Sequence, residues 1–303
     1  MIRYRRRGTT LVESLVVITV IGLLMSLLLP AVQSARESGR RVVCVNHLKQ
    51  MGLGLHLHHQ VHGRLPPGIT SSRRMFWTGS LLPFLEQQAL AESVDPELPW
   101  DSGDNAAVCA TYLPIFRCPT STAPRQMTAQ GIVNRSPSDY LACVSGTATR
   151  ESGPPPLAGE PDSDGLFFID SRTRLADILD GLSHTVALGE SVFIYESMGI
   201  DLTGSPQFVD RWTIGTFEGV GNEVSEGMGS TGVAINSHRL DVMVDEIELS
   251  FGSQHPGGAH IGFADGAVRL IRESIDPLTW SAMGTRNGAE AIGSPGGQGR
   301  PSN

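Results

Sequence analysis

The sequence predicts an α+β protein in which a long N-terminal helix, first transmembrane and then amphipathic, packs on an antiparallel β-sheet head. Three observations lead to this fold class. An apolar run from Thr9 to Leu29 precedes a helix-prone stretch whose apolar residues recur at steps of three and four. The chain also holds 35 glycines, 19 prolines and only 6% aromatic residues, which is typical of a loop-rich β head. Finally, residues 260–271 carry the pattern of a β-hairpin.

The apolar run is long enough to cross a membrane. As a helix its 21 residues would span about 30 Å, the thickness of a hydrocarbon core. Its single charge, Glu13, would be costly there and suggests a partner such as an α-amino group. An ordinary signal peptide fits less well, because no small-residue cleavage site follows the run; a plain signal anchor stays an alternative. The N-terminus is predicted to be cytoplasmic, because four arginines precede the run: Arg3, Arg5, Arg6 and Arg7.

Beyond residue 8 we divide the chain into a transmembrane half-helix (9–30), an amphipathic half-helix (31–62), a globular head (63–290) and a disordered tail (291–303). Pro30 lies between the two halves and should kink the helix, because proline removes one backbone hydrogen bond. The face of the second half that packs on the head is expected to carry Val42, Val45, Leu48, Met51 and Leu55.

Local patterns predict the elements of the head. We expect a short helix over 76–93, a glycine-capped helical turn over 174–181 and a mobile insertion at 219–236. Four further segments are expected to be strands: 113–119, 138–145, 165–170 and 185–190.

The hairpin is the sharpest local signal, because Asp265 and Gly266 stand between two apolar runs. A two-residue type I′ turn needs positive φ at both central positions, which this pair tolerates. The register would then pair Phe263 with Val268, and Ile261 with Leu270, all facing the core.

The histidines near this hairpin are interpreted as structural. His255 would lie about 15–20 Å from Asp265 along the strand, so His255, His260 and Asp265 should not form a metal or acid/base site. At the end of the long helix, four more histidines indicate a polar helix end, although His58 and His62 have the i, i+4 spacing of metal ligands: His56, His58, His59 and His62.

Charge and motifs exclude several functions. The formal net charge is −8, and removing residues 1–8, which hold four arginines and no acid, would leave −12. Such a head is a poor nucleic-acid binder, because phosphate contacts need clustered Lys and Arg. Ser183, His184 and Asp180 invite a hydrolase interpretation, but the Gly-x-Ser-x-Gly elbow is missing. We therefore predict no catalytic residue and no enzyme.

We also predict no metal site and no cofactor. The chain lacks the Cys-x-x-Cys spacing that is typical of zinc sites. On an oxidising side of the membrane the cysteines could instead form a disulfide, whose pairing the sequence does not specify, among Cys44, Cys109, Cys118 and Cys143. A calcium site stays an alternative, although the spacing of an EF-hand loop is absent. Its oxygen ligands would come from acids such as Asp162, Asp164, Asp241, Asp245 and Glu246.

The N-terminal residues resemble the class III leader of type IV pilins and type II secretion pseudopilins. The resemblance rests on Gly8, then Thr9-Thr-Leu-Val-Glu13, then the apolar run. It implies that a prepilin peptidase cuts after Gly8, removing leader residues 1–8, and methylates the new N-terminus at Thr9. It also implies that Glu13 docks the subunit into a fibre and that Pro30 kinks the helix. The family usually has phenylalanine after the glycine, where this chain has Thr9.

The head resembles the prepilin-type processing-associated proteins with an H-X9-DG motif, whose head is the DUF1559 domain. His255, Asp265 and Gly266 form that motif. Similar segments recur over about residues 8–290: Cys44-Val-Asn-His-Leu-Lys-Gln-Met-Gly-Leu, Leu65-Pro-Pro-Gly68, Leu82-Pro-Phe-Leu-Glu-Gln-Gln88, Phe116-Arg-Cys-Pro119, Asp180-Gly-Leu-Ser-His-Thr185, Gly189-Glu190 and Phe251-Gly-Ser-Gln-His-Pro-Gly-Gly258. This family implies no enzymatic activity.

Together these resemblances imply a pilin- or pseudopilin-like structural subunit of a type II secretion or type IV pilus-like system. Its partners would be prepilin peptidase, other pilin-like subunits and the inner membrane, with no nucleic acid. The chain would cross that membrane once, with the N-terminus cytoplasmic and the head periplasmic or extracellular. The alternative is a membrane-anchored surface module without a filament role, which binds a polysaccharide through Trp77, Trp100, Trp212 or Trp280.

Overall fold

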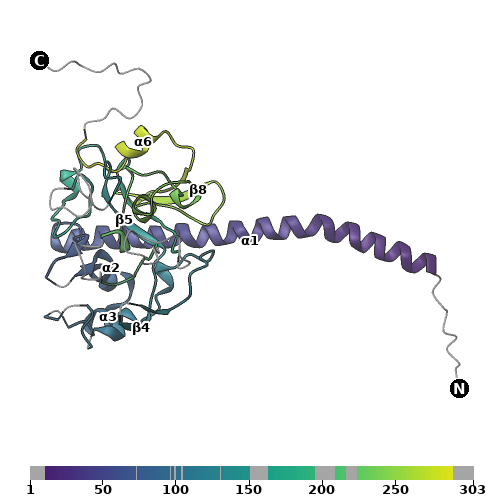
Figure 1. Cartoon of the computed structure of the whole chain (residues 1–303), viewed down its shortest axis with the longest axis horizontal. Helices are drawn as coiled ribbons and strands as arrows, with labels where there is room; N and C mark the ends of the chain where they lie inside the picture. Colours follow the sequence, from purple (N-terminus) through teal and green to yellow (C-terminus); the bar gives the residue numbers. More distant parts are fainter. Residues whose placement is uncertain are drawn as a thin grey trace, which may run out of the picture. The chain divides into compact units, whose positions relative to one another are not determined.

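The computed structural model describes residues 11–288 except residues 73, 96, 99, 104, 130, 151–162, 195–208 and 216–223 (Figure 1). The chain divides into two compact units, Met1–Val42 and Val43–Asn303, which we call the N-terminal unit and the head unit. The predicted tail, 291–303, lies outside the described residues.

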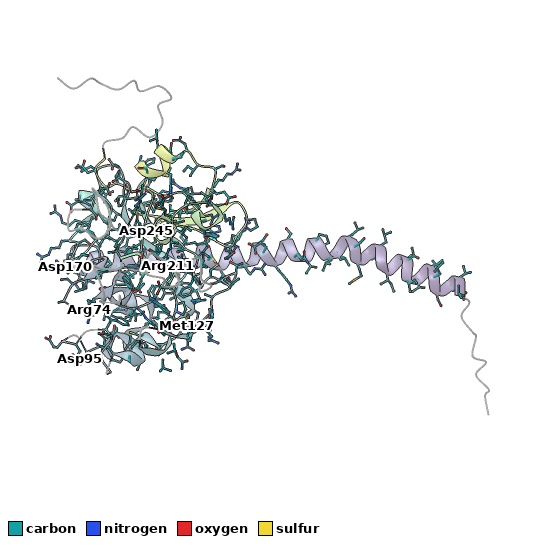
Figure 2. All side chains as sticks on the ribbon, in the orientation of Figure 1. Arg74, Asp95, Met127, Asp170, Arg211 and Asp245 are labelled. Atoms are coloured by element: carbon teal, nitrogen blue, oxygen red, sulfur yellow. The ribbon has the colours of Figure 1, made fainter. Side chains whose placement is uncertain are left out.

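The first element is the predicted long helix, α1 (Leu11–His62), whose 52 residues continue past Pro30. The predicted kink at Pro30 stays a prediction. In the N-terminal unit the apolar side chains of α1 stand out all around the helix (Figure 2), and its most apolar 18-residue window has none of its residues buried. By length and composition this helix can cross a membrane, although a signal sequence has the same features.

The part of α1 in the head unit buries one stripe, at Cys44, Leu48, Met51, Leu55 and His58. The steps of four, three, four and three place these side chains on one face of the helix. The predicted stripe was therefore partly wrong. Val42 is 58% exposed and Val45 is only half-buried. The buried face of α1 begins instead at Cys44, so neither valine lies on it.

The stripe packs on a five-stranded sheet with the order β7-β5-β6-β8-β9. All neighbouring strands in it are antiparallel except β5 and β7, which run parallel, so the predicted antiparallel sheet is mixed at one edge. Figure 1 shows β5 and β8 beside α1. The strands are β5 (Tyr140–Ser145), β6 (Val186–Glu190), β7 (Met228–Ser230), β8 (Gly258–Phe263) and β9 (Val268–Arg272).

Both faces of the sheet are covered. Alternate residues of β5 enter two different apolar clusters, because successive side chains of a strand point to opposite faces. Ala142 belongs to the apolar cluster that includes Leu48 and Met51 of α1, whereas Leu141 belongs to the cluster that includes Phe251 and Trp280. The head is therefore a layered α+β body, as predicted, with α1 on one face of the sheet.

Short elements complete the head. Two small hairpins pair β1 (Ile69–Thr70) with β2 (Met75–Phe76), and β3 (Met127–Ala129) with β4 (Ile132–Arg135). The helices are α2 (Trp77–Leu81), α3 (Gln88–Glu92), α4 (Ala106–Cys109), α5 (Val244–Glu248) and α6 (Pro277–Ala282). The 3-10 turns are η1 (Leu82–Leu85), η2 (Pro114–Phe116), η3 (Leu175–Asp177), η4 (Val224–Glu226) and η5 (Ser237–Arg239).

Some predicted elements were wrong. The strand expected over 113–119 contains η2, because Pro114 starts a 3-10 turn, and the strand expected over 165–170 contributes only a single bridge at Ile169. The helix expected over 76–93 is divided into α2, η1 and α3. Inside the insertion expected at 219–236, the structure forms the buried strand β7. The strands expected over 138–145 and 185–190 are present as β5 and β6.

The hairpin β8–β9 forms, but its register differs by one residue from the prediction. Ile261 pairs with Arg269, and Gly262 with Val268. The Gly266 N–H donates to the Phe263 carbonyl (2.8 Å), so the loop is a three-residue turn that ends at Gly266 with φ +79°. A one-residue slip reverses the faces of one strand relative to its partner, which explains why Leu270 is 40% exposed rather than part of the core.

Candidate metal centre

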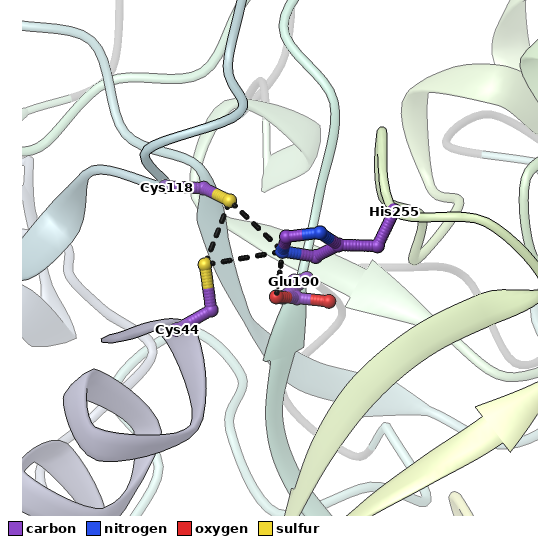
Figure 3. A group of neighbouring side chains, drawn as sticks. All are labelled: Cys44, Cys118, Glu190 and His255. Atoms are coloured by element: carbon purple, nitrogen blue, oxygen red, sulfur yellow. Dashed lines mark hydrogen bonds and ion pairs between the residues drawn. The ribbon is translucent and has the colours of Figure 1, made fainter. Parts of the chain in front are cut away.

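Four side chains from distant parts of the head unit converge at one buried point (Figure 3). Cys44 projects from α1, Cys118 follows η2, Glu190 ends β6, and His255 lies in the loop before β8. Cys44, Glu190 and His255 are at most 1% exposed, and Cys118 is partly exposed. The sequence predicts no metal site, yet these groups are all common metal ligands.

The imidazole of His255 lies at the centre of the cluster. Its Nε2 is 3.3 Å from the Sγ of Cys44, 3.4 Å from the Sγ of Cys118 and 3.6 Å from Oε1 of Glu190. The two sulfurs are 2.7 Å apart. One ligand atom from each of the four residues lies within 4.8 Å of all the others. Such a set could bind one metal ion, and the two thiols could alternatively form one disulfide.

The position of Cys118 is fixed by a buried ion pair. Asp139 accepts a hydrogen bond from the backbone N–H of Cys118 (2.8 Å), and the guanidinium of Arg117 lies 3.0 Å from the same carboxylate oxygen. Ser121 donates to the other oxygen of Asp139. Burial raises the pKa of Asp139 to about 6, although Arg117 opposes that shift.

Glu190 and His255 are also held by specific contacts. The backbone N–H of His260 donates to Oε2 of Glu190 (2.7 Å), and Nδ1 of His260 lies 3.1 Å from the same oxygen. The backbone N–H of His255 donates to the hydroxyl of Ser253 (3.2 Å). Groups that hydrogen-bond to metal ligands orient them, so this arrangement is the kind that a metal site needs.

The two thiols have opposite pKa shifts. The hydrogen bond between Cys44 and Cys118 lowers the pKa of Cys118 to about 5, in spite of burial and with smaller help from His255 and Thr120. The same hydrogen bond, together with burial, raises the pKa of Cys44. The thiolate is the form of cysteine that binds metals.

A small pocket borders the cluster. Its lining includes Cys118, Ser121, Glu190, Phe193 and Ser253. Two of the four clustered residues therefore border this pocket.

The sequence profile of a family described as "Protein of unknown function (DUF1559)" matches residues 33–278. The chain belongs to the DUF1559 family. No curated protein and no solved structure matches it. This DUF1559 match includes all four residues of the cluster and begins after the apolar half of α1. The family and the apolar helix together fit a membrane-anchored surface protein.

The cluster residues come from segments that carried the sequence resemblance to this family. Cys44, Cys118, Glu190 and His255 each lie in one of those segments. Cys44 and Cys118 were predicted only as disulfide candidates, His255 only as a hairpin residue, and Glu190 not at all. The signal that the sequence analysis missed is that four segments similar to the family each carry one potential metal ligand.

The other predicted residues lie apart from this cluster. Gly8 and Thr9 are outside the described residues, and Glu13 is in the first turn of α1. Asp265 and Gly266 lie in the hairpin turn, ten and eleven residues after His255. Cys109 and Cys143 are buried and separate, with thiols that donate to the carbonyls of Trp100 and Ser145.

The remaining chemical candidates have other contacts. Asp180 accepts hydrogen bonds from Thr285 and from the N–H of Gly288, while His184 contacts the neighbouring hydroxyl of Ser183 at 3.3 Å. Among the proposed calcium ligands, Asp162 is outside the described residues, and Asp164 accepts from Gly146 and Thr147. The rings of His58 and His62 are tilted by 42° with centres 4.3 Å apart, and Nδ1 of His58 lies 2.9 Å from the carbonyl oxygen of Arg64.

The tryptophans do not offer the polysaccharide surface that the alternative prediction requires. Each of the four is at most 2% exposed: Trp77, Trp100, Trp212 and Trp280. Their rings pack in the core because an indole buries a large apolar area, and the N–H of Trp77 donates to the carbonyl of Gly227. Stacking of sugars on these residues was therefore a wrong expectation.

Proposed function

We propose that this chain is a pilin-like or pseudopilin-like structural subunit of a type II secretion or type IV pilus-like system, anchored in the inner membrane by the N-terminal half of α1. A prepilin peptidase would cut after Gly8 and methylate Thr9. The head would lie on the periplasmic or extracellular side. Other pilin-like subunits would be its partners, and the role requires no catalytic step.

One observation supports an anchor over a removable signal sequence. α1 continues without a break from an apolar, exposed segment into the stripe that packs in the head core. A signal-peptidase cut just beyond the apolar segment would fall inside this continuous helix, at a place where no boundary separates a leader from the head. A retained apolar segment presents a surface that lipid or neighbouring helices would cover.

Glu13 supports the filament role. It is the only charged residue between residues 11 and 35. In a membrane such a group is costly unless it meets a partner. A methylated α-amino group on a neighbouring subunit is a partner of opposite charge, and repeated contacts of this kind generate an open filament.

The docking role is tested with Glu13→Gln, which keeps the size of the side chain and removes its charge. The variant should stay in the membrane and lose incorporation into filaments, measured by shearing filaments from cells and quantifying the subunit in each fraction. Ser26→Leu, which changes another polar residue of the same helix, is the matched control and should assemble normally. Normal assembly of the Glu13→Gln variant would refute the docking role.

A further inference from the structure

We propose that Cys44, Cys118, His255 and Glu190 bind one zinc ion that fastens α1 to the head. This inference is independent of the filament role. It rests on the type of the four side chains, their spacing, their burial and their supporting contacts.

The donor set suits zinc. Zinc in proteins takes four ligands from thiolate, imidazole and carboxylate groups, and a structural site is closed when all four come from the protein. Two sulfurs, one nitrogen and one oxygen form a mixed set that calcium and magnesium, which prefer oxygen ligands, would not select.

The spacing is close to that of a tetrahedral site. With bonds of about 2.3 Å to sulfur and about 2.1 Å to nitrogen and oxygen, neighbouring ligand atoms lie about 3.3–3.8 Å apart. The three distances from Nε2 of His255, at 3.3, 3.4 and 3.6 Å, fall in this range. The two sulfurs, at 2.7 Å, would separate by about 1 Å when an ion enters between them.

A disulfide explains less of the arrangement. It would join Cys44 to Cys118, but it would give no reason for a fully buried imidazole to approach both sulfurs. It would also give no reason for the carboxylate of Glu190, which already accepts from the N–H of His260, to lie 3.6 Å from the same imidazole. A zinc ion instead uses all four groups at once.

The ion would have a structural role. Cys44 and His255 are 211 positions apart in the chain, and Cys44 and Cys118 are 74 apart. A common ligand therefore links α1, the segment after η2, the end of β6 and the loop before β8. Because such a site does not exist in the unfolded chain, its binding free energy stabilises the fold.

The test uses the full chain, extracted in detergent and purified without added chelator. Elemental analysis should find about one zinc ion per chain, and thiol alkylation in denaturant without reductant should modify all four cysteines. Zinc should be lost in Cys118→Ala and His255→Ala. It should remain in Cys109→Ala and His184→Ala, which change the same residue types outside the cluster.

A second measurement does not depend on the folding of the variants. After zinc is removed by a chelator, the wild-type chain should show lower thermal stability, and added Co²⁺ should produce the visible and charge-transfer absorption of thiolate-bound tetrahedral cobalt. Added Zn²⁺ should abolish that absorption and restore the stability.

Three outcomes would overturn the proposal. The first is a metal-free chain with two thiols that become reactive only after reduction, which would indicate a Cys44–Cys118 disulfide. The second is a metal-free chain with four reactive thiols that gives no cobalt–thiolate absorption. The third is zinc that stays bound in folded Cys118→Ala and His255→Ala variants. None of these outcomes bears on filament assembly, which the Glu13→Gln variant tests separately.

Discussion

At the scale of single residues, Arg135 shows how this head buries a positive charge. Its side chain is fully buried between two indoles, with the guanidinium carbon 4.3 Å from the ring centre of Trp100 and 4.2 Å from that of Trp212. It also donates to the carbonyl of Gly215 (2.7 Å). The indole faces and the carbonyl oxygen replace the water that the cation loses on burial.

We expect Arg135→Ala to lower the free energy of unfolding by about 3 kcal/mol or more, because a desolvated cation–π contact and a charge-assisted hydrogen bond are lost together. Arg125 lies over Tyr112 at 3.9 Å but is exposed, so Arg125→Ala should cost only about 0.5–1 kcal/mol. Urea unfolding followed by tryptophan fluorescence measures both values. Equal losses in the two variants would contradict the stabilising role of the buried sandwich.

The residues of the candidate metal centre could be predicted only in part from the sequence. Short spacings such as Cys-x-x-Cys reveal sites whose ligands lie on one turn or one knuckle. Here Cys44 stands on α1, Cys118 follows η2, Glu190 ends β6 and His255 precedes β8, so the cluster exists only after the sheet has formed. His255 was singled out by its motif, but Glu190 looked like the last residue of an ordinary buried strand.

At the scale of elements, α1 contacts the turn of the hairpin β8–β9 directly. Lys49 of α1 donates to the carbonyl of Gly266 (2.8 Å) at the hairpin turn. A Cβ placed on Gly52 would stand 3.6 Å from the Cα of Gly266, an ordinary van der Waals distance, so the helix backbone lies close to the hairpin turn. The Asp-Gly pair predicted the hairpin. Its register was wrong because Asp265 and Gly266 fill the last two of three loop positions.

Gly266→Ala should destabilise the chain by about 1–2 kcal/mol, the cost of a left-handed backbone for a residue with a Cβ. The cost is one of conformation, since a Cβ at Gly266, with φ +79°, would meet only His56 at 3.8 Å. Gly103 lacks a positive φ and any atom within 4 Å of an added Cβ, so Gly103→Ala is the control and should be nearly neutral. Thermal unfolding compares them, and an unchanged midpoint for Gly266→Ala would disprove the constraint.

At the scale of the whole molecule, the sequence predicts the long helix better than it predicts the head, because the helix pattern extends over many more residues. The apolar run and the three- and four-residue steps predicted α1, because a long helix repeats its pattern over many turns. The head is built from short strands and 3-10 turns joined by loops, where each pattern covers only a few residues. This is why β7 was predicted as a mobile insertion, and why η2 was predicted as a strand.

The division between the units predicts how truncated chains behave. A chain that begins at Gln33, where the family match starts, loses the apolar half of α1 and should fold as a soluble protein without detergent. A control chain that begins at His56 also loses Leu48, Met51 and Leu55, which are at most 4% exposed. Their burial contributes about 5–9 kcal/mol, comparable with the 5–15 kcal/mol of a typical domain, so this chain should aggregate. Size-exclusion chromatography and circular dichroism distinguish the two, and a folded, monomeric control would mean that the head does not need α1.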